Sequence, residues 1–346
     1  MRRWVGRIVV LVLSAVSLYG LAPQLVDVWS QLPRLTSIGW GGLTIMVALE
    51  LCSFASAWAL HRVALPGLRW FAAATTQLSS NAVSRSVPGG AAMGAGLSVK
   101  MWRAAGVELG NAAGALAATS IISTGTLFLL PFVALGVAAL GAPIPENLTV
   151  VAAGAGVLAV LLFGGGTLLL ANDRAANASA RFVERLTGFV ARRVERHGLT
   201  AEDLLGRREE LVEALGPRWH RALAASVGNW TFDYAALAAA LVLLDTNPRF
   251  SLVMMAYGAA AVLAMIPITP GGLGFVEAGL TSLLTIAGIP ASSALLATLA
   301  YRIVSYWLPL VLGPIAWALF RRRYHQPKLD LESLELEGLA ADPMQS

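Results

Sequence analysis

Residues 266–279 read IPITPGGLGFVEAG, and this stretch decides how the rest of the chain is organised. It is flanked by apolar residues, yet it contains two prolines, four glycines and one carboxylate. Proline cannot continue a helix, and glycine adopts backbone conformations that other residues resist. We therefore expect a helix that begins near Ser251 to break between Pro267 and Gly272 and to restart toward Leu284. Inside a membrane, such a break is tolerated only where protein or a cavity surrounds it.

The composition predicts a polytopic helical membrane protein. Of the 346 residues, 57% are hydrophobic and 13% are charged, which is about half the ~25% charged residues of an average soluble protein. Apolar runs of ~18 residues or more recur, and this length crosses a bilayer as a helix. The single cysteine, Cys52, excludes a disulfide framework. We expect no cofactor, no metal and no nucleic-acid partner, because neither a ligand cluster nor a soluble basic face is evident.

The apolar runs predict about six full transmembrane helices. The first, at residues 5–22, follows a basic N-terminus, and we interpret it as an uncleaved span rather than a signal peptide because no clear cleavage site follows. The other expected spans lie at about residues 38–62, 108–140, 148–171, 222–244 and 292–320. Two further segments are too polar or too interrupted for ordinary spans, and each turns at a Pro-Gly-Gly tip. The predicted fold class is therefore all-α, with two re-entrant or broken helical hairpins beside the full spans.

The two tips, Pro88-Gly89-Gly90 and Pro270-Gly271-Gly272, stand 182 residues apart and indicate an internal repeat. At the same offset, Ala105-Gly106-Val107 matches Ala287-Gly288-Ile289. Upstream, an acid precedes each tip, by 38 residues in the first half and by 37 in the second. Each half therefore contains a span with an acid, a broken hairpin and a second span.

Basic residues predict that the two repeats are inverted in the membrane. Positively charged loops stay on the cytoplasmic side, which places both termini and the Arg-rich segment at residues 172–221 in the cytoplasm. The hairpin of repeat one (about 38–140) then enters from the cytoplasm, and that of repeat two (about 222–320) enters from outside. Inverted repeats with broken helices near the midplane are a recurring transporter design.

Two segments are expected outside the bilayer. Residues 172–221 contain ten arginines, and their apolar residues recur at helical spacing, so we interpret them as a cytoplasmic amphipathic segment on the membrane surface. A solvated linker is the alternative. The integral membrane domain is expected at residues 1–323, and residues 324–346 form a short acidic cytoplasmic tail.

The candidate binding residues gather around the two tips. After each tip a helix begins, and its first N–H groups and the positive end of its dipole favour an anion such as a lipid phosphate. Arg85 lies just before the first tip and Arg302 lies ten residues into the last span, and each offers a planar fork of donors. We predict a substrate-binding set made of the tips and the charges beside them: Arg85, Pro88, Gly89, Gly90, Pro270, Gly271, Gly272, Glu277 and Arg302.

A structural role is the alternative for each of these charges. A charge at the bilayer centre costs ~3 kcal/mol on insertion scales, so Glu277 and Arg302 are expected neighbours that either only pack the hairpin or also bind. Glu50 and Asp233 are candidate coupling groups, or else they lie on a hydrated helix face. We expect no enzyme, because phosphate-binding Gly-rich Lys loops, HExxH motifs and serine elbows are absent from the sequence.

Several motifs of the second half carry a family resemblance. They are PGGLGFVE at residues 270–277, Asn229-Trp230 with Asp233, and Tyr301-Arg302 followed by YWLP at residues 306–309. Together with VPGG at residues 87–90, they resemble the lysylphosphatidylglycerol synthase transmembrane-region family of flippase-like proteins. The resemblance implies a bacterial or archaeal protein of the cytoplasmic membrane, whose relatives translocate lipids. In the synthase a soluble catalytic domain follows this region; the sequence ends at Ser346, so we expect a stand-alone member without that activity.

The expected function is therefore that of a lipid flippase. The cargo would be an anionic or phosphate-linked lipid, such as a phospholipid, a polyprenyl phosphate or a glycolipid, with its headgroup between the tips and with Glu277 gating or exchanging a proton. Two alternatives remain. One is a non-transporting membrane partner of an envelope glycosyltransferase or lipid synthase, and the other is a proton-coupled transporter of a small anion.

Overall fold

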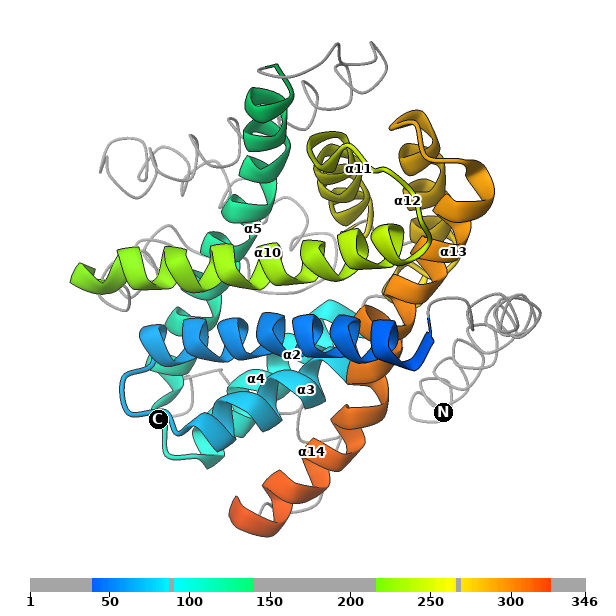
Figure 1. Ribbon diagram of the computed structural model, residues 1–346. Helices are drawn as coiled ribbons and strands as arrows, with labels where there is room; N and C mark the ends of the chain where they lie inside the picture. The colour runs from blue at the N-terminus through cyan, green and yellow to red at the C-terminus, as the bar shows by residue number, and fades with distance from the viewer. Residues whose placement is uncertain (1–38, 87–89, 140–215, 266–268, 325–346) are drawn as a thin grey trace, which may run out of the picture.

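The computed structural model describes residues 39–86, 90–139, 216–265 and 269–324, and these are folded into helices without any strand (Figure 1). This agrees with the predicted all-α class. The expected spans at residues 5–22 and 148–171, the tip residues Pro88 and Gly89, most of the surface segment and the acidic tail lie outside the described residues.

The two halves of the chain have the same order of helices. In each, a long helix is followed by a pair of shorter ones and then by a second long helical stretch. The first half contains α2 (Gly39–Ala64), α3 (Trp70–Ser86), α4 (Gly90–Ala104) and α5 (Leu109–Ala139). The second half contains α10 (Trp219–Leu243), α11 (Phe250–Leu263), α12 (Phe275–Ile286), α13 (Ala291–Arg302) and α14 (Leu308–Tyr324). Short turns or helices precede α10, precede α12 and join α13 to α14: η3 (Gly216–Arg218), η4 (Pro270–Gly272) and the π-helix η5 (Ile303–Trp307).

The helix break predicted from the opening stretch is confirmed. Helix α11 ends at Leu263 and α12 begins at Phe275. Between them, Gly271, Gly272 and Gly274 have φ angles of 57°, 72° and 79°. Side chains with a β-carbon rarely adopt this left-handed backbone, so the glycines are what allow the chain to reverse here.

Matching turns close the second arm of each hairpin. Gly106 and Gly288, 182 residues apart, have φ angles of 94° and 93°. In the first turn the next residue, Val107, donates to the carbonyl of Trp102 at 3.0 Å; in the second, Ile289 donates to Leu284 at 3.1 Å. Both are the glycine-dependent caps that end many helices. The repeat seen in sequence thus corresponds to equivalent helix ends in the structure.

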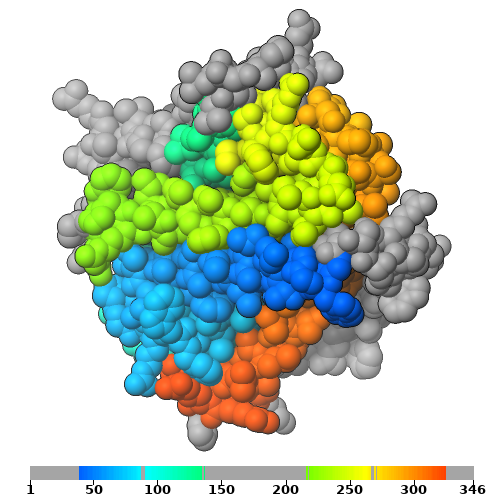
Figure 2. Space-filling view, viewed as in Figure 1, coloured from blue at the N-terminus to red at the C-terminus, as the bar shows by residue number. Residues whose placement is uncertain are grey.

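The halves pack through equivalent pairs of helices. Helices α2 and α10 lie side by side, as Figures 1 and 2 show, while α3 packs on α14 and α11 packs on α5. A β-carbon at Gly313 of α14 would lie 2.8 Å from the carbonyl oxygen of Leu78, and one at Gly258 of α11 would lie 2.9 Å from Pro131 Cγ. Small residues therefore permit both close crossings.

The two hairpins enter the bundle from opposite ends. Where α5 begins, the turns after α2 and α4 meet Arg218 and Tyr324 around one pocket. Where α5 ends, Ala134 packs with Leu252 of α11 and with Ala287, which follows α12. The open end of the α3–α4 hairpin is thus at the start of α5, and that of the α11–α12 hairpin is at its far end.

Three stretches of the described chain are long and apolar enough to cross a membrane: Gly39–Ala64, Leu109–Ala134 and Ala291–Tyr324. Each carries exposed apolar side chains of the kind that face lipid, such as Ile45, Val133 and Val311. Helix α10 has 25 residues, and carries Asn229 and Asp233 within its length, which makes it less apolar than those three. Its crossing of the membrane, and the total of six spans, stay predictions.

Candidate functional site

A cavity of about 340 Å³ lies between the two halves. This is within the ~300–1,000 Å³ of typical ligand pockets. Its walls come from α2, α3 and α5 of the first half and from α10, α11, α12, α13 and η5 of the second. Four predicted site or coupling residues line it together: Glu50, Arg85, Asp233 and Arg302. Each stands on a different helix, so only the packing of the bundle brings them to one place.

Helix α3 presents a polar stripe to this cavity. Gln77, Asn81 and Arg85 follow one another at every fourth residue and all line it, because residues four apart share one face of a helix. The same helix packs its small residues against α14, where the Ser79 hydroxyl donates to the carbonyl of Gly313 at 3.3 Å. The polar residues that made this segment a poor candidate for a full span therefore include residues that line the cavity.

Arg85 crosses from the first half to the last helical stretch. Its guanidinium donates to the backbone carbonyls of Ser305 and Tyr306, the latter at 3.2 Å. In return the Tyr306 hydroxyl donates to the carbonyl of Arg85 at 3.1 Å. Both acceptors belong to the π-helix η5, and such wide turns recur at functional sites. The contact joins the tip of the first hairpin to the second half of the chain.

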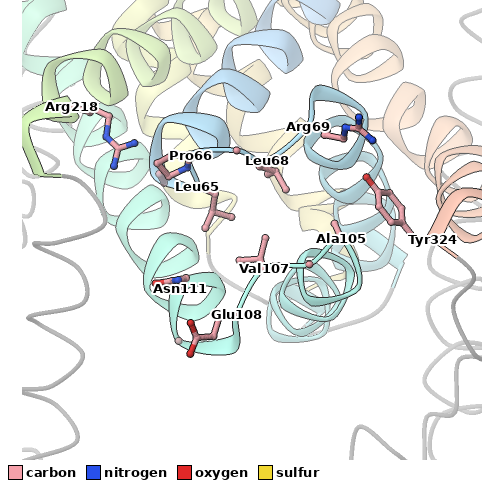
Figure 3. Close-up of a pocket in the computed structure, with 14 residues that line it drawn as sticks. Leu65, Pro66, Leu68, Arg69, Ala105, Val107, Glu108, Asn111, Arg218 and Tyr324 are labelled. Carbon is pink, nitrogen blue, oxygen red and sulfur yellow. The ribbon is translucent and has the colours of Figure 1, made fainter.

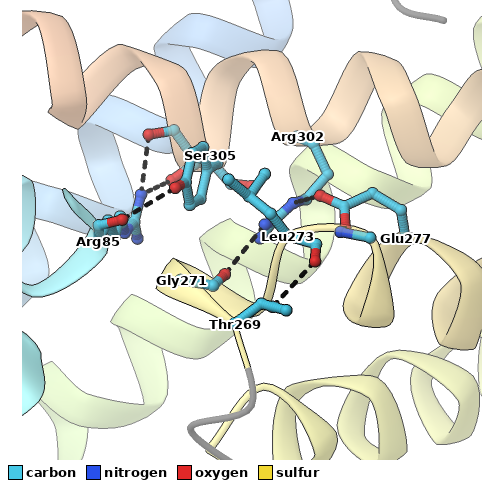
Figure 4. A network of polar contacts seen from close by, with 9 residues as sticks. Arg85, Thr269, Gly271, Leu273, Glu277, Arg302 and Ser305 are labelled. Carbon is cyan, nitrogen blue, oxygen red and sulfur yellow. Dashed lines mark hydrogen bonds and ion pairs between the residues drawn. The ribbon is translucent and has the colours of Figure 1, made fainter. Parts of the chain in front are cut away.

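Glu277 and Arg302 form an ion pair, which confirms the predicted pairing. Glu277 Oε1 accepts from Arg302 Nε at 2.6 Å, and the Arg302 and Glu277 side chains are 11% and 16% exposed. The other carboxylate oxygen accepts from the Gly274 amide at 2.7 Å, and Arg302 also donates to the carbonyl of Gly271 at 3.1 Å. Figure 4 shows Arg302 reaching both the hairpin tip and the start of α12. The pair therefore fixes the tip of the second hairpin against α13.

The ring of Tyr306 lies between the two arginines of the cavity. The guanidinium carbons of Arg85 and Arg302 are 5.5 and 4.4 Å from its centroid, within the range of cation–π attraction. A β-carbon at Gly271 would lie 3.0 Å from the Tyr306 hydroxyl oxygen and closer still to its ring. Gly271 is thus needed for this close approach as well as for its positive φ.

Two carboxyl groups lie on the α2–α10 side of the cavity. Asp233 Oδ2 accepts from the Tyr301 hydroxyl at 2.6 Å and from the Tyr257 hydroxyl. Glu50 is 2% exposed, and its Oε2 atom has no hydrogen-bond partner in the described part of the chain. Glu50 also interacts electrostatically with Asp233. Both coupling candidates therefore lie in the cavity, and neither lies on a hydrated outer face.

Of the tip glycines, Gly90, Gly271 and Gly272 are described, and these three do not line the cavity. A β-carbon at Gly90 would lie 2.6 Å from the carbonyl oxygen of Ser84, so Gly90 serves the close packing of α4 on α3. A β-carbon at Gly272 would meet Val276, which does line the cavity. Pro270 begins the turn η4. The glycines shape the hairpins, and the residues beside them face the cavity.

Several lining residues were not among the predicted site residues. They are Ser53, Gln77, Asn81, Ser123, Tyr257 and Ser305. The four-residue spacing of Gln77, Asn81 and Arg85 was a usable signal in the sequence. Tyr257 had none, because it lies in an apolar run and its hydroxyl meets Asp233 only in the folded bundle.

The motif residues Asn229 and Trp230 join α10 to its neighbours. The Asn229 amide donates to the Ser53 hydroxyl of α2 at 2.7 Å, and the Trp230 indole donates to the carbonyl of Ser123 in α5 at 2.9 Å. Buried polar groups need such partners. These bonds join α10 to α2 and to α5 in the wall of the cavity, one turn before Asp233.

A second pocket, of about 560 Å³, lies at the end of the bundle where α5 begins. Figure 3 shows Arg218 and Asn111 on one side of it, and Arg69 and Tyr324 on the other. Its walls are mostly turn residues, and no predicted site residue lines it. This pocket lies where the turns after α2 and α4 meet the residue before α10 and the end of α14. Four of the predicted site or coupling residues line the central cavity instead.

Comparison with known proteins identifies relatives of the chain. The family profile described as Lysylphosphatidylglycerol synthase TM region matches residues 3–313. A UPF0104 membrane protein of Methanothermobacter thermautotrophicus is 32% identical over 91 residues, which are 26% of this chain and 26% of that protein. The match therefore spans about a quarter of that relative. No solved structure matches significantly.

Proposed function

This chain belongs to the lysylphosphatidylglycerol synthase TM region family, and from that premise we propose that it moves an anionic or phosphate-bearing lipid between the leaflets of the cytoplasmic membrane. Its family and its apolar helices make it an integral membrane protein. One observation carries the proposal: Arg85 from the first half and Arg302 from the second line the same cavity. Arginine recognises phosphate through a planar fork of donors.

The cavity suits a headgroup and not a whole lipid. One wall is polar, and the other is made of small or apolar side chains from α11 and α12: Ala260, Ala261, Ala264, Val276 and Leu280. About 340 Å³ holds a phosphate with a small substituent, while the acyl or prenyl chains stay among the lipids that face the exposed apolar side chains. We propose that only the headgroup leaves the bilayer surface during transport.

The arrangement of the hairpins supports exchange between two open states. They enter the bundle from opposite ends, and equivalent helix pairs pack in each half, α3 on α14 and α11 on α5. Basic residues gather at the end where α5 begins: Arg62, Arg69, Arg218 and Arg321–Arg323. By the positive-inside rule we propose that this end of the bundle faces the cytoplasm, together with both chain termini. The α3–α4 hairpin then enters from the cytoplasm, and the α11–α12 hairpin enters from outside.

The Glu277–Arg302 pair acts as the gate in this proposal. A lipid phosphate competes with Glu277 for the Arg302 guanidinium, since both are anionic and both accept from the same donors. When Arg302 leaves Glu277, it also leaves the carbonyl of Gly271, and the tip of the second hairpin loses these polar bonds to α13. Headgroup binding is thereby coupled to movement of the tip. Both Glu277 oxygens are already engaged, so the role assigned to Glu277 is to hold the gate.

Reconstitution tests the proposal directly. Purified protein in phosphatidylcholine liposomes that contain a trace of fluorescent phosphatidylglycerol is expected to move the label between leaflets, as followed by chemical quenching of the outer leaflet. Arg85→Gln and Arg302→Gln are each expected to slow movement at least ~10-fold, equivalent to ~1.4 kcal/mol of barrier. Arg249→Gln is the matched control, because Arg249 is exposed and lies away from the cavity.

The alternatives give different results in the same liposomes. A protein that moves neither phospholipid nor polyprenyl phosphate, while remaining folded, would favour the non-transporting partner of an envelope enzyme. Uptake of a labelled soluble anion into the lumen, without lipid movement, would favour the small-anion transporter. We propose no enzymatic activity, so unchanged lipid masses after incubation are expected.

A further inference from the structure

Two carboxyl groups meet at the contact between the equivalent helices α2 and α10. Glu50 lies on α2 and Asp233 lies on α10, and both line the central cavity. Glu50 is 2% exposed. Both side chains face the same cavity of about 340 Å³, and they interact electrostatically. This places a buried pair of acids at the interface between the two halves, where the relative position of those halves is set.

The hydrogen bonding of Glu50 and Asp233 requires a proton on one of the two carboxyl groups. Asp233 accepts from the hydroxyls of Tyr257 and Tyr301, whereas Glu50 Oε2 has no partner in the described ranges. Ionised carboxylates only accept hydrogen bonds, so two of them side by side cannot satisfy each other. A proton on one supplies the missing donor, with its O–H group donating to the carboxylate of the other.

The surrounding charges do not neutralise both acids. Within residues 39–86, 90–139, 216–265 and 269–324, neither Glu50 nor Asp233 forms an ion pair. Arg302 is paired with Glu277, and the guanidinium of Arg85 donates to backbone carbonyls. Two adjacent carboxylates in a poorly solvated site cannot both stay ionised. The other titratable or charged groups that line the cavity are Arg85 of α3, Tyr257 of α11, and Tyr301 and Arg302 of α13.

We propose that Glu50 and Asp233 form a site for one exchangeable proton. In the arrangement seen here, Glu50 carries the proton, because its buried Oε2 atom has no partner in the described ranges, whereas Asp233 accepts from two tyrosine hydroxyls. It leaves to water in the cavity when the second acid gains a donor or a cation, for instance when Arg302 is released from Glu277 and turns toward the pair. No bond other than O–H is made or broken, and the net change is one proton passed to water. Its coupling to lipid movement rests on the proposed function, whereas its binding does not.

Infrared spectroscopy tests the binding of the proton. The purified protein at neutral pH is expected to show the C=O stretching band of a buried protonated carboxyl group, and this band should shift in D₂O. Glu50→Gln should remove the band, because Glu50 is 2% exposed and its Oε2 atom has no partner in the described ranges. Asp233→Asn should shift the band, because the Glu50 O–H group then faces an amide and not a carboxylate. Asp245→Asn should leave it, because Asp245 is exposed and its φ of 53° suits asparagine equally well.

Several outcomes would overturn the proton site. One is a wild-type spectrum without a protonated carboxyl band at neutral pH, a result that does not depend on any variant folding. Another is a band that survives unchanged in folded Glu50→Gln. A band that sodium chloride removes and choline chloride does not would assign the site to Na⁺ and likewise overturn the proposal.

Liposomes with an imposed pH gradient test the coupling. For one coupled proton, each unit of pH difference is expected to change the steady-state ratio of labelled lipid between leaflets by up to ~10-fold. Whatever lipid movement Glu50→Gln retains should reach the same ratio with and without the gradient. A wild-type ratio that ignores the gradient would refute the coupling. If no lipid moves at all, the proposed function fails, and the infrared result alone judges the proton site.

Discussion

Three variants, Glu277→Gln, Arg302→Gln and the two combined, measure what the ion pair contributes to the second hairpin. In the native chain, Glu277 accepts from Arg302 and from the amide of Gly274, the residue before α12, and Arg302 in turn donates to the carbonyl of Gly271. Each single change leaves the other group without its main partner. The combined change leaves no unpaired charge. The three variants therefore form a double-mutant cycle.

The magnitude follows from the burial of the pair. Removing one partner of a fully buried ion pair costs ~3–5 kcal/mol, because the remaining charge is left unpaired. Here the Arg302 and Glu277 side chains are 11% and 16% exposed, so water compensates part of the loss. We expect each single variant to lower the free energy of unfolding by ~2–3 kcal/mol. The double variant should lose about as much as either single one, which is a coupling energy of ~2–3 kcal/mol.

Reversible unfolding in mixed detergent micelles, followed by tryptophan fluorescence, measures these differences. Asp245→Asn serves as the control for loss of an exposed carboxylate, and it is expected to change the unfolding free energy by less than ~0.5 kcal/mol. If the two single losses simply add in the double variant, to within ~0.5 kcal/mol, the residues do not stabilise each other. That result would refute the reasoning that makes this pair the gate.

Three further predictions concern packing, the cavity and topology. Gly313→Ala should destabilise the protein by ~1–3 kcal/mol through the α3–α14 contact. Gly41→Ala is the control and should not destabilise it, because a β-carbon there meets nothing within 4 Å. Equal melting temperatures of the two variants would contradict this prediction. Tyr301→Phe removes one donor to the cavity carboxylate and should cost ~1.5 kcal/mol by the same unfolding assay. The topology can be tested by cysteine labelling in the Cys52→Ser background. Glu108→Cys should react with a membrane-impermeant thiol reagent only from the cytoplasm, and Asn247→Cys only from outside. Labelling of both from one side would exclude opposite entry of the hairpins.

The sequence was sufficient wherever local chemistry decides the backbone. The break between α11 and α12 follows from proline and glycine, whose effects act on the residues that carry them. The 182-residue offset located two equivalent turns, at Gly106 and Gly288, because glycine is required at a left-handed helix end whatever surrounds it. The ion pair of Glu277 with Arg302 was also predictable, since a charge in an apolar segment needs a partner and few were available.

The residues that line the central cavity could not be identified from local sequence chemistry. The sequence placed the anion between the glycine tips, but in the structure Gly90 packs against the backbone of α3 and Gly271 packs against Tyr306. The cavity lies beside the tips, and Glu50, Arg85 and Asp233 line it from three different helices. Tyr257 joins them from an apolar run that carried no signal.

There is a physical reason why the sequence predicted the helix ends but not the residues of the cavity. Where a helix begins, breaks and ends depends on backbone geometry and on the few residues at that position, so the sequence alone predicted the break between α11 and α12 and the equivalent turns at Gly106 and Gly288. Which side chains share a cavity depends on how closely and at which faces distant helices pack. Only the tertiary structure decided that α2 and α10 lie together and that Glu50 and Asp233 face one cavity.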